Sequence, residues 1–118
     1  MLRTEDFEAR ATGRFVRVAP RKVRIVADMI RGKQVHEALE ILAFTPRRGA
    51  QVLRKLLYSA VANAKDQNVG DVDNLIVSKV MVDQGPNYKR WRPRAMGRAT
   101  RVNKFTSHVH VFVADGNR

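Results

Sequence analysis

One segment of this 118-residue chain carries many positive charges and no negative ones. The sequence has no Asp or Glu between Asp83 and Asp115, although seven Lys and Arg residues stand between Gly85 and Lys104. Like charges at this density repel one another and cannot be buried in a core without partners. We therefore expect the segment to lie outside the core and to bind a dense polyanion. The seven residues are Lys89, Arg90, Arg92, Arg94, Arg98, Arg101 and Lys104.

Two predicted strands flank this basic segment. Leu75–Asp83 and Phe105–Ala114 are rich in β-branched residues and alternate with a period of two. The first would set Ile76, Val80 and Val82 opposite Leu75, Val77 and Met81, and the second would set Val109, Val111 and Val113 opposite His108, His110 and Phe112. The connection, residues 84–104, is longer than ordinary hairpin loops and as a ribbon would project roughly 30 Å. A disordered, solvated charge run is the alternative, but the flanking strands argue against it.

The first half of the chain predicts a strand and three helices. The strand covers Arg14–Val18, and a first helix starts at Pro20 and ends near Gly32, which suits a left-handed cap. Thr45 is the expected N-cap and Pro46 the expected first residue of the third helix. The three apolar stripes are Val23, Val26, Ala27 and Ile30; Val35, Ala38, Leu39, Leu42 and Ala43; and Ala50, Leu53, Leu57, Ala60, Val61 and Ala64.

The whole-chain charge points to an anionic partner. The net charge is +12 and the pI is about 11.3, values typical of proteins that meet nucleic acid or an anionic membrane. The chain has no cysteine, which excludes disulfides and thiolate chemistry. The longest apolar-rich stretch, Leu56–Ala64, is about half the length of a membrane span, and the acidic start of the chain does not fit a signal peptide. We expect one domain over residues 1–118 of a soluble, intracellular protein.

A second basic cluster precedes and enters the first predicted helix. Asp28 is its only acid, and a helix N-terminus favours phosphate oxygens. A merely solvated helix face remains the alternative. The cluster contains Arg14, Arg17, Arg21, Lys22, Arg24, Arg31 and Lys33, and a weaker third patch contains Arg47, Arg48, Arg54 and Lys55.

Groups that could carry catalysis or bind a metal are few. His108 and His110 share a strand face, but only His36 is left as a third histidine ligand. Ser107 and His108 would point to opposite faces, which excludes a triad with Asp115. Glu37 and Glu40 are best interpreted as a solvated pair, and no Gly-rich phosphate loop occurs. We expect no enzyme activity, no metal and no cofactor.

Five segments in order resemble the universal L-twenty-two family of large-subunit ribosomal proteins, over about Gly13 to Asp115. They are PRKVRIVADMIRGK (20–33), EALEILAFTPRRGA (37–50), LLYSAVANA (56–64), VDQGPNYKRWRPRAMGRA (82–99) and TSHVHVFV (106–113). The resemblance implies an α+β fold, with three helices packed on a three-stranded antiparallel sheet and a long protruding basic hairpin at residues 84–104.

The resemblance also implies a function. The body would lie near the mouth of the nascent-chain tunnel, and the hairpin would penetrate 23S-type ribosomal RNA and line the tunnel. The hairpin tip would contain Tyr88, Lys89, Arg90, Trp91, Arg92, Pro93, Arg94 and Ala95. Implied partners are ribosomal RNA, neighbouring ribosomal proteins, the nascent polypeptide and macrolide antibiotics, with the protein a monomer in the particle and no membrane involved.

Three positions depart from the pattern expected of that family. Trp91 replaces an aliphatic residue, Gly49 replaces an alanine, and the acidic stretch Thr4–Glu8 extends the N-terminus. Gly49 is expected to weaken the third helix by about 1 kcal/mol if it lies inside it. The main hypothesis is a structural ribosomal RNA-binding protein. A free-standing DNA architectural protein is the alternative, and a small nuclease or hydrolase is a distant third.

Overall fold

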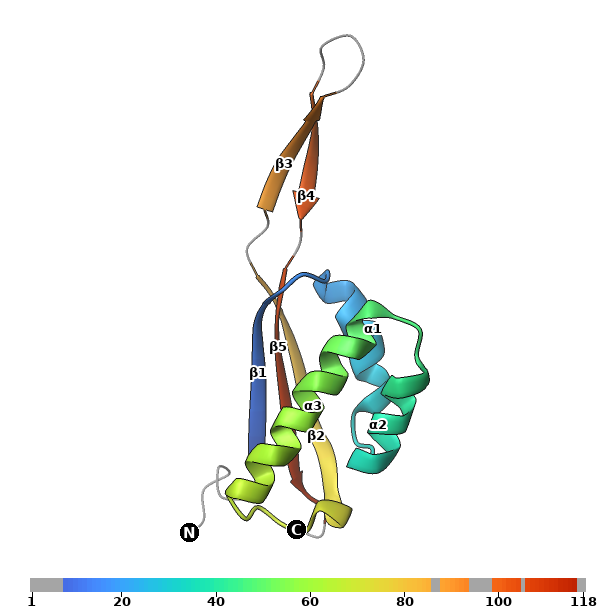
Figure 1. The fold of residues 1–118 in the computed structure, drawn as a ribbon, viewed down its shortest axis with the longest axis vertical. Coiled ribbons are helices and arrows are strands. Elements are labelled where there is room, and N and C mark those ends of the chain that lie inside the picture. Colours follow the sequence, from blue (N-terminus) through green and yellow to red (C-terminus); the bar gives the residue numbers. More distant parts are fainter. Residues whose placement is uncertain (1–7, 86–87, 94–98, 105, 117–118) are drawn as a thin grey trace.

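The computed structural model describes residues 8–85, 88–93, 99–104 and 106–116, with only the backbone of the strands between 88 and 104. The elements follow one another as shown in Figure 1. They are β1 (Glu8–Val16), α1 (Pro20–Ile30), α2 (Val35–Phe44), α3 (Arg48–Asp66), the 3-10 turn η2 (Val72–Asn74), β2 (Leu75–Gln84), β3 (Tyr88–Pro93), β4 (Ala99–Lys104) and β5 (Ser107–Asp115).

Three strands form an antiparallel sheet in the order β1-β5-β2, and the three helices cover one face of it (Figure 1). The predicted α+β architecture is confirmed. The central strand β5 turns Val109, Val111 and Val113 toward the helices, and all three are fully buried. His108, His110 and Phe112 alternate onto the open face, as the period of two predicts.

The strand β2 departs from its predicted alternation. Leu75 and Val77 are buried, and so are Val80 and Val82, which were expected on the opposite face. The pairing with β5 shifts between Val77 and Lys79. A bulge of this kind inserts one residue and reverses the phase of alternation, so both halves of the strand bury their valines.

The first strand lies earlier than predicted. β1 covers Glu8–Val16, whereas Arg14–Val18 was expected, because the strand pairs with β5 from Glu8 opposite Ala114 onward. Small alternating residues on this strand, Ala9 and Ala11, are buried under the helices. Short side chains give little hydrophobic signal, so the sequence pattern did not reveal them as core.

The first helix matches its prediction. It starts at Pro20, its stripe is fully buried, and Gly32 adopts a positive φ of 76° just beyond its end. In α2, Ala43 is exposed although it was expected in the apolar stripe.

The start of α3 was predicted two residues too early, at Pro46. The helix begins at Arg48 with Arg47 as its N-cap, because the Thr45 hydroxyl donates to the Ile41 carbonyl and closes the end of α2 instead. Every residue predicted for the α3 stripe is buried.

The edge strand β2 is covered by the α1–α2 connection. The amide of Gly32 donates to the Val77 carbonyl, and the amide of Val77 donates to the Lys33 carbonyl, both at 2.9 Å. A bridge between Gln34 and Ile76 continues this contact. These bonds occupy the polar edge that would otherwise remain open to another strand.

A second, two-stranded sheet formed by β3 and β4 projects from the body (Figure 1). Its antiparallel register runs without interruption from Tyr88 opposite Lys104 to Pro93 opposite Ala99. The principal extents of 65 × 32 × 19 Å reflect this projection. No helix in the described part of the chain is long and apolar enough to cross a membrane.

Candidate nucleic-acid interface

The end of the body from which the hairpin leaves, here named the hairpin end, is where Val16 and Gln84 each pair with Ser107. Helices α1 and α3 both begin at this end (Figure 1). Neither helix has an acidic residue in its first turn. Because helix N-termini present free N–H groups and a positive dipole end, the backbone at the hairpin end already favours anions.

Basic residues from two separate stretches meet at the hairpin end. A Cβ added to Gly49 would lie 3.5 Å from the carbonyl oxygen of Lys22, so α3 approaches α1 closely. This contact brings Arg47 and Arg48 beside Arg21 and Lys22, and all four are exposed. The second and third basic patches predicted from the sequence therefore adjoin at the helix starts.

A hollow of about 350 Å³ opens between the start of α1 and the end of β2. It is lined by Ala19, Pro20, Arg21, Arg24 and Gln84. The guanidinium groups beside a helix N-terminus suit a phosphate group, because a planar fork donates two hydrogen bonds to neighbouring oxygens.

Two of the predicted RNA-binding arginines also hold the protein together. Arg24 donates from Nη2 to the Val82 carbonyl at 3.0 Å, and Arg31 donates from Nη2 to the Val80 carbonyl at 2.8 Å. Arg31 also pairs with Asp28. Both guanidinium groups therefore join α1 to the edge strand β2, a role that the sequence pattern did not indicate.

The other residues of the N-terminal basic cluster are spread over the body. Arg14 lies on β1, and Arg17 follows it in the turn before α1; both are exposed. The Nζ atom of Lys33 lies 3.9 Å from Oε1 of Glu37 beyond the other end of α1. Lys33 is thus separated from the hairpin end by the length of that helix.

The remaining predicted site residues fall on the hairpin. The structure gives the backbone of β3 and β4, which places Tyr88 to Pro93 alongside Ala99 to Lys104. The side-chain roles expected for Tyr88, Lys89, Arg90, Trp91, Arg92, Pro93, Arg101 and Lys104 lie outside the described part, as do Arg94, Ala95 and Arg98 altogether.

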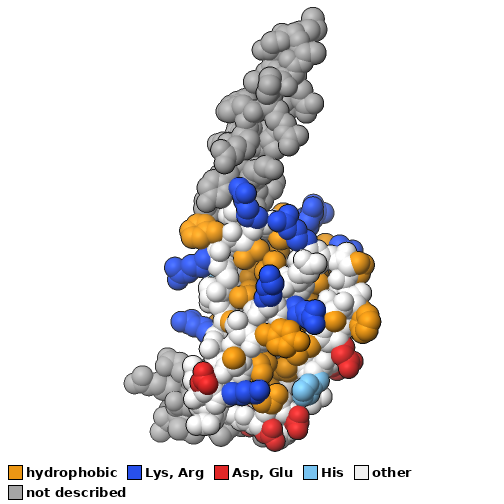
Figure 2. Space-filling view, viewed as in Figure 1, with side chains coloured by type: hydrophobic (Ala, Val, Ile, Leu, Met, Phe, Trp, Pro, Cys, Tyr) orange, Lys and Arg blue, Asp and Glu red, His pale blue; other side chains and the backbone are white. Residues whose placement is uncertain are grey.

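Charge is distributed unevenly along the body. Figure 2 shows most Lys and Arg side chains toward the hairpin end and the visible Asp and Glu side chains toward the opposite end, here named the far end. Asp66, Asp71, Asp73 and Asp115 belong to segments at the far end, where Leu75 pairs with Asp115. Asp83, at the end of β2, is an acid at the hairpin end.

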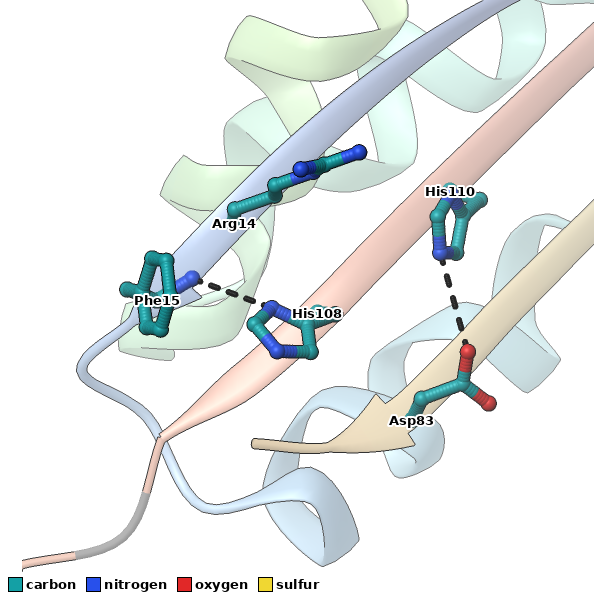
Figure 3. A pocket seen from close by; sticks show the side chains of 5 residues that line it. All are labelled: Arg14, Phe15, Asp83, His108 and His110. Atoms are coloured by element: carbon teal, nitrogen blue, oxygen red, sulfur yellow. Dashed lines mark hydrogen bonds and ion pairs between the residues drawn. The ribbon is translucent and has the colours of Figure 1, made fainter. Parts of the chain in front are cut away.

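A pocket of about 260 Å³ lies on the open face of the sheet at the hairpin end. Figure 3 shows its five lining residues on three neighbouring strands: Arg14, Phe15, Asp83, His108 and His110. The backbone amide of Phe15 donates to Nδ1 of His108 at 3.2 Å. Nε2 of His110 lies 3.6 Å from a carboxylate oxygen of Asp83. Sequence reasoning identified the shared face of the two histidines but missed Phe15 and Asp83 as their neighbours.

Ser107 and His36 each contact a residue outside the pocket that contains His108 and His110. The buried hydroxyl of Ser107 donates to the Val18 carbonyl at 2.5 Å, on the face opposite His108. His36 contacts Asp73 at 3.2 Å, on an element away from the other two histidines. Within the described residues, no group of three or more potential ligands could hold a metal ion.

The rest of the predicted third patch, Arg54 and Lys55, lies on the outer face of α3. Arg54 places its guanidinium 5.8 Å from the centre of the Tyr58 ring, and Lys55 lines the same hollow of about 340 Å³. Tyr58 is about half exposed. An aromatic ring paired with arginine gives this surface some capacity to stack on bases, but it stands apart from the hairpin end.

Comparisons with known proteins agree with this geometry. The family described as ribosomal protein L22p/L17e matches residues 11–114. The large ribosomal subunit protein uL22 of Maridesulfovibrio salexigens is 57% identical over 108 residues, which cover 92% of this chain and 98% of that protein. The match includes all three helices, the basic hairpin, the whole of β2 and most of β1 and β5. The chain therefore belongs to the L22p/L17e family of ribosomal proteins.

Proposed function

We propose that this protein binds 23S-type ribosomal RNA through its hairpin and the hairpin end of its body. Family membership makes the chain a structural protein of the large ribosomal subunit, not an enzyme. The observation that carries the proposal is the concentration of uncompensated positive charge at one end of the molecule (Figure 2). Such a charge distribution orients a protein toward RNA and supplies most of its affinity.

The hairpin arginines are expected to lie between RNA helices and to lower the repulsion between their phosphates. Arginine suits this role because its planar fork contacts two phosphate oxygens and its face stacks on bases. The arm contains five Arg and two Lys, which agrees with this account. Contacts of this kind recognise RNA shape and backbone more than base edges.

The body is expected to contribute phosphate contacts next to the hairpin. Arg14, Arg17, Arg21 and Lys22 are exposed at or near the hairpin end, as this role requires. Arg24, Arg31 and Lys33 belong to the same proposed surface, and each contacts another group of the protein, so we assign these three a smaller share than Arg14, Arg21 and Lys22.

We further propose that the hairpin tip, Tyr88–Ala95, lines the nascent-peptide exit tunnel. The uninterrupted β3–β4 pairing supports the reach of the hairpin, because a regular ribbon can carry its turn far from the body. In this register Tyr88 lies at the base of β3, opposite Lys104, and Pro93 lies next to the turn, so we assign the tunnel contacts mainly to the end of the range near Pro93. The nascent polypeptide and macrolide antibiotics would then be contacts of the tip. Residues 1–118 would act as one RNA-binding domain, as a monomer beside neighbouring ribosomal proteins.

The salt dependence of binding to 23S-type RNA tests the proposal. Each neutralised phosphate contributes roughly 0.7–0.9 to the slope of log affinity against log salt. Replacing Arg90, Arg92, Arg94 and Arg98 with Gln should flatten the slope by about 3 if all four contact phosphate. A matched variant with Arg10, Lys55, Lys65 and Lys79 replaced by Gln loses the same charge from the body and should change the slope much less. An unchanged slope for the hairpin variant would remove the hairpin from the binding surface.

A further inference from the structure

The pocket on the open face of the sheet has features that general phosphate binding does not explain. Its volume of about 260 Å³ is below the range of roughly 300–1,000 Å³ for pockets that hold drug-sized ligands. It combines an aromatic ring, a carboxylate, a guanidinium and two imidazoles, contributed by β1, β2 and β5 (Figure 3). A flat heterocycle with polar edges is the kind of group that matches both the size and this mixture.

Phe15 holds an unusual backbone conformation at the edge of this pocket. Its φ is 56°, in the left-handed region that bulky residues avoid. It lies where the pairing of β1 with β5 shifts between Gly13 and Val16, a position at which bulges commonly carry glycine. The residue is 54% exposed, and the edge-on contact of its ring with the His108 ring has a centroid distance of 5.0 Å. The strained backbone thus presents an aromatic face to solvent beside the pocket.

The polar groups of the pocket are already oriented. Because Nδ1 of His108 accepts the Phe15 amide, the neutral ring carries its proton on Nε2 as a donor. A Cβ added to Gly85 would lie 2.5 Å from the Thr106 hydroxyl oxygen and 3.4 Å from that Nε2 atom, so the chain at Gly85 passes close to Thr106 and His108. On the neighbouring residue of the same face, Nδ1 of His110 lies 3.0 Å from the Thr12 hydroxyl. Each imidazole is therefore fixed by β1 before any ligand arrives.

Asp83 gives the pocket its selectivity. Its side chain is 61% exposed, and the distance of 3.6 Å to His110 leaves both carboxylate oxygens able to accept hydrogen bonds. A carboxylate repels phosphate, so it does not serve the phosphate contacts assigned to the rest of the hairpin end. It accepts instead from N–H donors, and two adjacent N–H donors on one base edge occur in guanine alone, at N1 and N2.

We propose that this pocket binds one unpaired guanine base of the RNA. Asp83 would accept from N1–H and N2–H. The Arg14 guanidinium would reach the edge with O6 and N7, because arginine side chains commonly form bidentate contacts with these two guanine atoms. The Phe15 ring would stack on the base, as aromatic side chains do with unpaired RNA bases. The inference rests on the proposed RNA-binding function and adds one position of direct base reading to it.

Single-stranded heptamers of the form UUUXUUU, with X as G, inosine, A, C or U, test this inference with the full-length protein. Fluorescence anisotropy should show the G heptamer binding about five- to tenfold more tightly than the U heptamer, the lower part of the range for a bidentate base contact. Inosine lacks the N2 amino group and should fall between them. The ring signals of His108 and His110 should shift in NMR spectra on addition of the G heptamer, whereas those of His36 should not.

Two pairs of variants identify the groups responsible. Asp83→Asn should abolish the preference for G, while Asp73→Asn, which removes the same charge beside His36, should preserve it. Phe15→Leu keeps an apolar side chain but removes the stacking face, and it should weaken binding of the G heptamer. Arg21→Gln should weaken all heptamers alike.

Two results would overturn the inference: equal affinity of the native protein for G and U heptamers, or an Asp83→Asn variant that tightens every heptamer equally. In the second case the carboxylate would be only a repulsive charge. If the salt dependence of binding to 23S-type RNA were still as predicted for the native protein and the hairpin variant, the proposed function would stand without the guanine site. Loss of all RNA binding by the native protein would instead contradict the proposed function itself.

Discussion

Gly49 and Gly32 differ in whether their backbone conformation suits a residue with a side chain. Gly49 is buried inside α3, and a Cβ there would make ordinary contacts of 3.4 Å with Val23 Cα and 3.6 Å with Val26 Cγ2. Gly32 has nothing within 4 Å of an added Cβ, but its φ is +76°. Space is therefore available at both positions, and only the backbone conformation distinguishes them.

Gly49→Ala is expected to raise the free energy of unfolding by about 0.5–1 kcal/mol, because alanine restricts the unfolded chain and favours the helix. Gly32→Ala should lower it by about 1–2 kcal/mol, because an L residue is strained at positive φ. Urea denaturation followed by circular dichroism measures both changes. A destabilised Gly49→Ala variant would contradict the packing described between α1 and α3.

Ser107 anchors the start of β5 to the connection between β1 and α1. Its buried hydroxyl donates to the Val18 carbonyl, so Ser107→Ala leaves a buried acceptor without this partner. We expect a loss of about 1–3 kcal/mol in the free energy of unfolding. Ser59→Ala, on the exposed side of α3, is the control and should change stability by less than about 0.5 kcal/mol. Equal stabilities of the two variants would show that the hydroxyl bond contributes nothing.

The elements of the body were predictable where the side-chain pattern was strong. Pro20 and Gly32 marked the ends of α1, and the apolar stripe of α3 was correct throughout. The start of α3 was missed because Thr45 is able to cap either helix, and only the packed structure shows its hydroxyl on Ile41. The phase of β2 was missed because a bulge depends on the partner strand and leaves no regular sequence signal.

The candidate site was predictable in composition but not in arrangement. The basic residues were evident from the sequence, yet the close approach of Gly49 to Lys22, which brings the two basic stretches together, depends on how α3 packs on α1. The pocket with Phe15 and Asp83 requires three strands to lie side by side. Contacts of this kind join residues far apart in the chain, so local periodicity does not reveal them.

Arg31, which follows the last residue of α1, and Lys22, in its first turn, carry the same charge but have different structural surroundings. Arg31 donates to the Val80 carbonyl on β2, whereas Lys22 is exposed at the start of α1. Arg31→Met should lower the free energy of unfolding by about 0.5–1.5 kcal/mol, and Lys22→Met should leave it nearly unchanged. For RNA binding we expect the opposite ranking of the two variants: Lys22→Met should reduce the salt slope more than Arg31→Met does. Parallel denaturation and filter-binding measurements decide between this division of roles and a uniform phosphate-binding helix.

In the molecule as a whole, the positive charge is concentrated at the end from which the hairpin projects. The hairpin end also contains the N-termini of α1 and α3 and most exposed arginines of the described residues (Figures 1 and 2). Most of the described acidic residues belong to the far end. This polarity gives the protein a preferred orientation in the field of a polyanion. We therefore expect the hairpin end to enter the RNA and the far end to face away from it.

Association with the large subunit should depend on ionic strength. In sucrose gradients of native lysate, we expect one copy of this chain per large subunit at moderate salt. The variant with Gln at Arg90, Arg92, Arg94 and Arg98 should dissociate at a lower salt concentration, because fewer phosphates are neutralised. Recovery of the native chain with duplex DNA and away from the subunit peak would favour a free-standing DNA architectural protein instead.

Cryo-electron microscopy of large ribosomal subunits that contain this chain tests the central claim most directly. We predict density for β3 and β4 enclosed by ribosomal RNA, with Arg21, Lys22 and Arg48 against phosphates and the far end directed away from the RNA. Subunits in which the hairpin projects into solvent, or in which the acidic far end contacts the RNA, would contradict the account.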